Sequence, residues 1–206
     1  MTGQADRGPV VDVLYAIAGT VLPADYRFEL MGEIARCLPW LQTQSSVGIH
    51  PLRAARGDSG RLLLPKRAKL VMRMPEGQVT AAAALSGQEL EVGGWTLRVG
   101  AALVRRLVPH GTLYAYFVTA DTDDEQVFTA QIGARLGELK IPCKVVCGKR
   151  QAFPAGHRQV AGYSLMLHDL TPEDSLLLQQ VGLGSDRQLG CGIFVPHRSA
   201  AAVGTG

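Results

Sequence analysis

The stretch Pro172-Glu-Asp-Ser-Leu-Leu-Leu-Gln-Gln-Val181, Gly182-Leu-Gly184-Ser-Asp-Arg187-Gln-Leu-Gly190-Cys-Gly192, Ile193-Phe-Val195 predicts a helix, a glycine-rich loop and a strand in immediate succession. Four glycines in eleven residues end the helix, allow positive φ and let the backbone approach a ligand closely. A loop with few side chains and an arginine near its centre is suited to contact phosphates. We therefore expect nucleic acid contacts from Gly182, Gly184, Arg187, Gly190 and Gly192. A tight turn that packs the last helix on a sheet would use the same glycines.

Along the whole chain, one order of elements occurs twice. In the first half, alternation predicts a strand over 10–18, and apolar residues four apart predict a helix over 26–37. The other elements expected there are strands at 47–49 and 69–74, a helix at 76–85 and a strand pair at 90–99. In the second half we expect strands at 113–119, 144–147, 162–168 and 193–195, and helices at 123–140 and 171–181.

Each half thus has the order β-α-β-β-α-β, which is the ferredoxin-like arrangement. The sequence predicts an α+β protein of tandem ferredoxin-like (RRM-like) units, the first over residues 1–100 and the second over 101–206. RNA-recognition modules share this sheet architecture, although neither half has their aromatic RNP signature.

The composition is that of a folded protein, because apolar residues make up 47% of the chain and charged residues 19%. The cysteines form no C-x-x-C pair and have no histidine at zinc spacing, so we expect reduced thiols, no metal site and no cofactor. No apolar run reaches about 18 residues and no signal pattern precedes the first strand, which predicts a cytoplasmic protein that does not span a membrane.

Positive charge is concentrated in two segments, although the net charge is only +3. The first runs from Arg53 to Arg73 and holds seven Lys or Arg residues against one acid, Asp58. The second consists of Lys140, Lys144, Lys149, Arg150 and Arg158. Clustered cations suggest a face for a polyanion, with solvated edge loops as the alternative interpretation.

Three features together resemble one family, the CRISPR-associated endoribonucleases that process precursor guide RNA, the Cas-six family. They are the tandem β-α-β-β-α-β order, the loop 182–192 and the segment Val47-Gly-Ile-His50-Pro-Leu-Arg53. The stretch Gly60-Arg-Leu-Leu-Leu-Pro65-Lys-Arg-Ala-Lys69-Leu-Val-Met-Arg73-Met-Pro75 is similar to the Myxan subtype of that family. The resemblance covers nearly the whole chain.

The resemblance implies a metal-independent RNase that cuts CRISPR repeat RNA and often stays bound to the guide RNA, in some members together with other effector-complex subunits. The chemistry implied is attack of a ribose 2′-OH on the adjacent phosphorus, which leaves a 2′,3′-cyclic phosphate. Such a cleavage needs a proton acceptor, a donor for the leaving 5′-oxygen and positive charge near the phosphate. Histidine suits the proton transfer because its unperturbed pKa is near 6.5.

His50 is the best candidate for that histidine, since Gly48 permits close approach, Pro51 fixes the following chain and cations follow. The resemblance also places the family's catalytic histidine there, while a structural histidine at a strand end is the alternative. Tyr26 is a candidate to orient the 2′-OH, with ordinary packing as the alternative. Arg53 and Lys66 are the first choices for the scissile phosphate. The further candidate RNA contacts are Arg56, Arg67 and Lys69.

Two other functions fit parts of the sequence. A non-catalytic guide-RNA-binding subunit of an effector complex would show the same basic clusters and glycine loop. His110-Gly-Thr112 and His197-Arg-Ser199 match the His-x-Thr/Ser pattern of the two-histidine RNA phosphoesterases. The second match is followed only by small residues up to Gly206, which are poorly suited to form the strand that should hold it.

Overall fold

The computed structural model describes residues 8–58 and 60–197. These residues form two compact units. Of the described residues, the first comprises 8–58 and 60–106 together with 154–158 and 187–190, and the second comprises 107–153, 159–186 and 191–197. The predicted division between residues 100 and 101 falls inside a strand, Trp95–Arg106, and stays a prediction.

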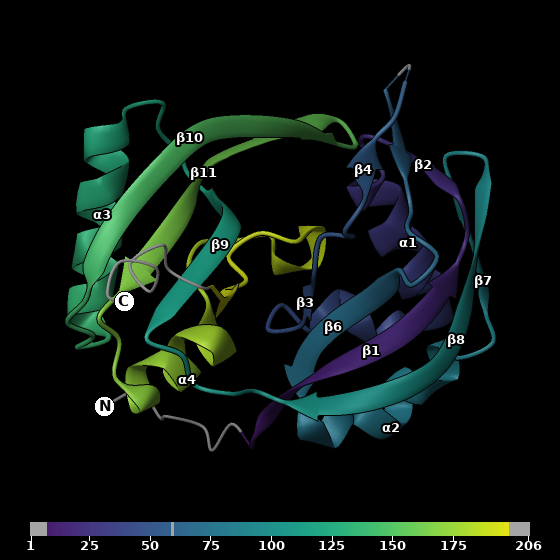
Figure 1. Ribbon diagram of the computed structural model, residues 1–206, viewed down its shortest axis with the longest axis horizontal. Coiled ribbons are helices and arrows are strands. Elements are labelled where there is room, and N and C mark those ends of the chain that lie inside the picture. The colour runs from purple at the N-terminus through teal and green to yellow at the C-terminus, as the bar shows by residue number, and fades with distance from the viewer. Residues whose placement is uncertain (1–7, 59, 198–206) are drawn as a thin grey trace, which may run out of the picture. The chain divides into compact units, whose positions relative to one another are not determined.

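The first unit contains a five-stranded sheet with β1 (Val10–Ala18) at its centre (Figure 1). β1 pairs antiparallel with β6 (Lys69–Pro75) on one side and β8 (Trp95–Arg106) on the other. The edges are β3 (Gly48–Ile49) and β7 (Glu89–Val92), in the order β3-β6-β1-β8-β7. β1 therefore lies between β6 and β8, the strands that take the third and fourth places of the β-α-β-β-α-β order, as the ferredoxin-like arrangement requires.

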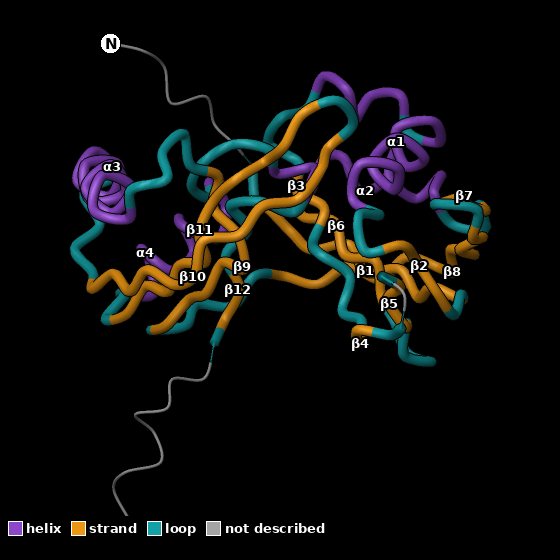
Figure 2. Tube along the Cα trace, turned by 90° about the horizontal axis from the view of Figure 1, so that it is seen from above, coloured by secondary structure: helices purple, strands orange, loops and turns teal. Residues whose placement is uncertain are grey.

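Helices cover one face of this sheet (Figure 2). The main helix is α1 (Arg27–Cys37), which is followed by a 3-10 turn, η1 (Pro39–Thr43). The single helix expected over 76–85 is instead three short pieces, η2 (Glu76–Gln78), α2 (Val79–Ala82) and η3 (Ala83–Leu85). Gly77 lies in the first piece, and glycine is among the poorest helix formers.

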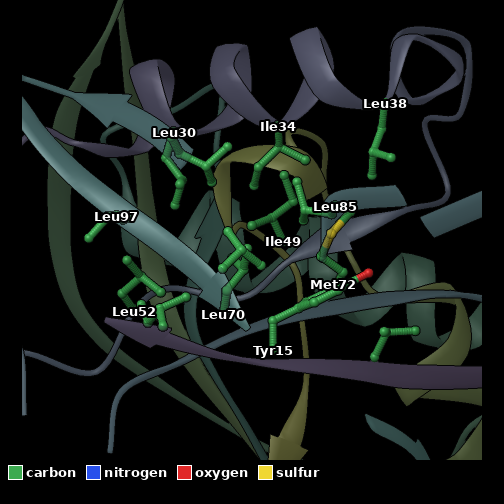
Figure 3. Close-up of a cluster of buried hydrophobic side chains, with 14 of the residues drawn as sticks. Tyr15, Leu30, Ile34, Leu38, Ile49, Leu52, Leu70, Met72, Leu85 and Leu97 are labelled. Carbon is green, nitrogen blue, oxygen red and sulfur yellow. The ribbon is translucent and has the colours of Figure 1, made fainter. Parts of the chain in front are cut away.

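The core of the first unit lies between α1 and the sheet (Figure 3). Leu30 and Ile34 of α1 point toward Tyr15 of β1 and Met72 of β6 in this view. The Tyr15 hydroxyl donates a hydrogen bond of 2.7 Å to the carbonyl of Ala82. Alternation along β1 therefore leaves Asp12 on the sheet face away from the helices.

A small sheet that the sequence did not predict carries part of the basic segment. Its strands are β2 (Val21–Pro23), β5 (Arg61–Leu63) and β4 (Ala55–Arg56), in the order β2-β5-β4. These strands are two or three residues long, so the alternation that reveals longer strands has too little length to show.

The second unit has the same topology, with strand order β10-β11-β9-β12. Its elements are β9 (Thr112–Thr119), α3 (Glu125–Glu138), β10 (Lys144–Ala155), β11 (Arg158–His168), α4 (Pro172–Val181) and β12 (Val195–Pro196). β10 and β11 are longer than expected and form a hairpin. A short 3-10 turn, η4 (Arg187–Leu189), belongs to the first unit. Two ferredoxin-like units in an α+β protein confirm the predicted fold class.

Side-chain caps begin both helices of the second unit. Asp124 accepts hydrogen bonds from the backbone N–H groups of Gln126 and Val127, and Thr171 accepts one from Asp174. These bonds satisfy N–H groups that the first turn of a helix leaves without partners. Among the residues that the structure describes, no helix is long and apolar enough to cross a membrane.

Candidate active site

His50 directly follows the edge strand β3 and faces away from the helix-covered core. Its N–H donates to the carbonyl of Val71 at 2.9 Å, which continues the register of Ile49 opposite Met72. Ile49 and Met72 are core residues, so alternation places the next side chain, His50, on the opposite face of the sheet. Only 12% of the His50 side chain is exposed.

Asp12, Arg73 and Arg105 lie side by side on three neighbouring strands near His50. In the sheet register Asp12 of β1 is opposite Arg73 of β6 and opposite Arg105 of β8. Arg73 Nε donates to Asp12 Oδ1 at 2.8 Å, and Arg105 Nη2 donates to Oδ2 at 3.0 Å. Asp12 and Arg73 are buried, whereas 57% of the Arg105 side chain is exposed.

His50 Nε2 is 3.6 Å from Asp12 Oδ1, which is slightly longer than a hydrogen bond. Nε2 is buried and has no hydrogen-bond partner among the described residues. Burial lowers the pKa of His50, Asp12 opposes this effect, and the positive charges of Arg73 and Arg105 add to it. The neutral ring is therefore favoured at neutral pH.

The Asp12 carboxyl is held as an anion. Burial by itself would raise its pKa, but the contacts with His50 and Arg73 and the charge of Arg73 outweigh burial and hold the pKa well below its usual range. The buried pair of Asp12 and Arg73 is thus charged beside a neutral histidine.

Tyr26 precedes α1 and is buried, with 4% of its surface exposed. Its hydroxyl oxygen accepts a 2.7 Å hydrogen bond from the N–H of Leu52, two residues after His50. Burial raises the pKa of Tyr26, so its hydroxyl stays protonated at neutral pH. The structure therefore brings two predicted site residues, Tyr26 and His50, to one place.

Tyr26 and His50 both line a cavity of about 10 Å³, which is room for about one water molecule. Its lining residues are Tyr26, Arg27, Leu30, Ile49, His50, Pro51, Gln188 and Leu189. Arg27 Nη1 donates to the carbonyl of Leu189 at 3.2 Å, and Gln188 Nε2 donates to the carbonyl of Leu41 at 2.8 Å. Side chains from α1 and η4 thus enclose one side of His50.

Arg187 is buried rather than displayed on a loop surface. It is 8% exposed, and its Nε donates to the carbonyl of Ser46 at 3.2 Å, just before β3. Burial, with a further contribution from the charge of Arg73, lowers its pKa to about 10. Arg187 therefore anchors the segment that leads to His50, a role that its sequence position alone did not indicate.

Gly190 packs against the residues on both sides of His50. Its φ is +84°, and a Cβ there would lie 3.0 Å from Pro51 Cγ and 3.2 Å from the Ile49 carbonyl oxygen. A side chain at this position would displace the segment that carries His50. The backbone at Gly190 thus lies close to other residues of this protein, Ile49 and Pro51.

The other three glycines of the loop lie in the second unit. Gly182 ends α4 with φ +66°, and the N–H of Gly192 donates to the carbonyl of Phe117 at 2.7 Å. Both are buried, while Gly184 is exposed and has φ +77° beside Thr119. Tight packing and positive φ explain why glycine occupies these positions. Contacts of these glycines with RNA stay a prediction.

The predicted basic residues outside the loop are all exposed: Arg53, Arg56, Lys66, Arg67 and Lys69. A broad hollow of about 470 Å³ is lined by Arg53, Ala54, Ala55, Leu63, Leu64 and Pro65. Lys66 lies in the turn between β5 and β6, and the interactions among the described residues include none between Lys66 and His50. Arg56 lies in β4 of the small sheet, Arg67 lies beside Lys66 in the turn after β5, and Lys69 begins β6 of the five-stranded sheet.

The two-histidine motif lies in the second unit. His110 Nδ1 is 3.0 Å from the carbonyl oxygen of Thr112, and the backbone N–H of His197 is 3.1 Å from that same oxygen. Ser199 falls outside the described residues. Within the described ranges, no group of three His, Cys, Asp or Glu side chains could hold a metal ion.

A family model described as Cas6 Crispr matches residues 11–199. The chain belongs to the Cas6 family. It is 32% identical over 194 residues to a curated CRISPR-associated endonuclease Cas6 of Myxococcus xanthus, and the match covers 94% of this chain and 84% of that protein. The family resemblance predicted from the sequence is thereby confirmed.

Solved structures show the Cas6 fold at much lower identity. A RAMP protein that binds different RNA substrates is 12% identical, with a TM-score of 0.71, and the match covers 91% of this chain and 100% of that one. A Cas6-related protein from Pyrococcus furiosus is 11% identical, with a TM-score of 0.66, covering 92% and 99% of the two chains. At such identities the likeness supports the fold alone.

Proposed function

We propose that this Cas6-family endoribonuclease cleaves CRISPR repeat RNA by attack of a ribose 2′-OH on the adjacent phosphorus. The products are a guide RNA with a 2′,3′-cyclic phosphate and a fragment with a free 5′-OH, and no metal ion takes part. The observation that carries the proposal is a largely buried histidine, His50, in the first unit of a Cas6-family chain, followed by a segment that the buried Tyr26 holds through Leu52.

In this mechanism His50 accepts the proton of the 2′-OH. A base must be unprotonated to act, and burial favours the neutral ring at neutral pH. Tyr26 keeps the chain after His50 in place through its bond to Leu52, and in this way it positions His50 relative to the ribose. Neither residue forms a covalent bond with the RNA.

Exposed cations hold the RNA. Arg53 and Lys66 contact phosphates near the cut, and the other binding cations are Arg56, Arg67 and Lys69. Such contacts make the affinity fall as salt rises, because each neutralised phosphate releases counterions. Exposed Gly184 contacts the repeat, and Gly182 and Gly192 shape the backbone of the second unit near it. Gly190 and Arg187 pack against the segment of the first unit that carries His50. The guide RNA remains bound after cleavage and is passed to other effector-complex subunits in this state.

The test is cleavage of an end-labelled CRISPR repeat RNA in EDTA by wild type, His50→Ala and the double variant His110→Ala/His197→Ala. We expect His50→Ala to lose about 10² to 10⁴-fold in rate, the usual share of a general base, and to keep RNA binding. The double variant serves as the control and should cut normally. A 2′-deoxy nucleotide at the cut should block every form.

Other outcomes reject the proposal. Cutting by His50→Ala at the wild-type rate, with loss in the double variant, would move the chemistry to the two-histidine motif. Tight binding with no cutting by any form would assign a guide-RNA-binding subunit. Loss of wild-type activity in EDTA that returns with magnesium would exclude a metal-independent reaction.

A further inference from the structure

Asp12 is a buried carboxylate at the centre of the sheet face that carries His50. It is 2% exposed, and both its oxygens interact with cationic side chains. A buried charge is costly unless it is paired, and pairing with Arg73 alone would satisfy that need. Charge pairing does not account for the whole arrangement, because Oδ1 also lies 3.6 Å from His50 Nε2.

We propose that Asp12 is a positioning residue that orients the His50 ring and stabilises the imidazolium formed when His50 takes a proton. The inference rests on the proposed function of His50. It is carried by the sheet register, which places Asp12 beside Arg73 and Arg105, and by the direction of Nε2 toward the carboxylate.

The ring nitrogens then have different tasks. Nε2 is buried and faces Asp12, and no hydrogen bond of Nδ1 occurs among the described residues. Nδ1 accordingly takes the proton of the 2′-OH. The proton on Nε2 of the resulting imidazolium points at a carboxylate that stays ionised throughout, so no proton passes to Asp12. The leaving 5′-oxygen takes its proton from solvent and departs as the 5′-OH. A shift of a few tenths of an ångström would bring the 3.6 Å separation into hydrogen-bond range.

Arg73 holds Asp12 in this position. Its guanidinium donates to both carboxylate oxygens, Nε to Oδ1 at 2.8 Å and Nη2 to Oδ2 at 3.3 Å, which fixes the plane of the carboxylate. Arg105 adds a third bond from the exposed side. A carboxylate locked by two arginines loses little entropy when it aligns a neighbouring ring.

Asp12 and Arg105 act on His50 in opposite directions. The Asp12 charge raises the pKa of His50, whereas Arg73 and Arg105 lower it. The other charged or titratable groups near the site are Tyr26 and Arg27 beside the cavity and Arg187 on η4. Because the base must be neutral, the acidic limb of the cleavage rate follows the His50 pKa. Asp12→Asn should move that limb to lower pH, and Arg105→Gln should move it to higher pH.

The experiment measures single-turnover cleavage at saturating RNA across pH, below the melting temperature of every variant. We expect Asp12→Asn to slow cleavage at neutral pH by about 10 to 100-fold, part of the effect of losing the base, with RNA affinity unchanged. Glu89→Gln is the matched control, because it removes another carboxylate paired with an arginine, Arg98, in the same sheet at 2.8 Å. It should change neither rate nor pH profile.

Asp12→Asn leaves Arg73 buried without a carboxylate and could unfold the unit. Two further variants cover that case. Asp12→Asn/Arg73→Gln removes both buried charges, and Arg105→Gln alters an exposed partner. If the acidic limb moves in opposite directions for loss of Asp12 and loss of Arg105, Asp12 acts through His50. Equal profiles in all folded variants would overturn the inference.

The proposed function and this inference fail differently. Wild-type cleavage by His50→Ala removes the basis of both. Strong loss in His50→Ala, with wild-type rate and pH profile in the Asp12 variants, rejects only the role of Asp12. The combination Asp12→Asn/His50→Ala should cut as slowly as His50→Ala alone, because a residue that acts through another adds nothing once that residue is gone.

Discussion

The two units share one topology but use the central strand of the sheet differently. In the first unit, the strand face away from the helices carries buried Asp12, paired with Arg73 and Arg105 and adjacent to His50. In the second, the alternate positions of β9 carry Tyr114 and Tyr116, whose rings are 4.9 Å apart, edge to face. The same fold thus supports a charged site once and an aromatic surface once, which agrees with function residing in sites grafted on folds.

The two units also differ in how their helices begin. α3 and α4 of the second unit begin with the side-chain caps Asp124 and Thr171, whereas α1 of the first unit begins after Tyr26 without a side-chain cap. The Tyr26 hydroxyl accepts instead from Leu52, near His50. In the first unit α1 therefore lacks a stabilising side-chain cap, and the side chain before it instead fixes the segment around the candidate base.

Among substitutions that test this comparison of the two units, Gly190→Ala is expected to have the largest effect on stability and RNA cleavage. The positive φ costs about 1–2 kcal/mol for any side chain, and crowding against Pro51 adds about 1–3 kcal/mol. Because the crowding displaces the His50 segment, we expect a lower melting temperature together with slower RNA cleavage.

Gly87→Ala is the matched control for that change. Gly87 lies in the same unit and has φ +81°, but a Cβ there would meet nothing within 4 Å. It should lose stability through φ alone and keep its cleavage rate per folded molecule. Equal cleavage rates for the two variants would show that Gly190 does not support the site.

The sequence was sufficient for the overall fold because long elements leave regular patterns. Alternation in β1 and the cap and proline before α4 predicted those elements nearly to the residue. The three strands of the small sheet were missed, since two or three residues cannot establish a period. The helix expected over 76–85 was wrong in detail, because short-range apolar spacing does not distinguish one helix from successive short turns.

The candidate site was only partly predictable for a related reason. His50 stood out by its neighbours in sequence, and Tyr26 by its place at a helix start. Asp12 looked like the polar half of an ordinary alternating strand, and Arg73 like one more cation of a basic segment. Only the antiparallel register brings Asp12 opposite Arg73, 61 positions away. Arg187 was expected to contact phosphates. Its burial beside Ser46 joins segments 141 positions apart in the chain, and no local sequence pattern predicts that contact.

Tyr26→Phe has the next largest expected effect. It removes the acceptor for the buried N–H of Leu52, which costs about 1–2 kcal/mol, and it loosens the chain next to His50. We expect a lower free energy of unfolding in urea and slower cleavage at saturating RNA.

Tyr15→Phe provides the comparison for Tyr26, because Tyr15 is also buried and its hydroxyl also binds a backbone group, the Ala82 carbonyl, at 2.7 Å. Its bond lies on the helix-covered side of the sheet. The two variants should lose similar stability, but only Tyr26→Phe should lose activity. If Tyr15→Phe slowed cleavage as much, the effect would come from general loosening of the unit.

The smallest effect on stability is expected from Asp124→Ala, which tests a helix cap of the second unit. Asp124 caps α3 by accepting from the N–H groups of Gln126 and Val127 at 2.7 and 3.2 Å. Loss of such a cap costs about 1 kcal/mol. Since the cap serves only its own helix in the second unit, urea unfolding should show the loss while cleavage by the folded protein stays at the wild-type rate. Slower cleavage at full RNA occupancy would mean that the helix starts of both units serve the reaction, and the division of labour inferred from Tyr26 would not hold.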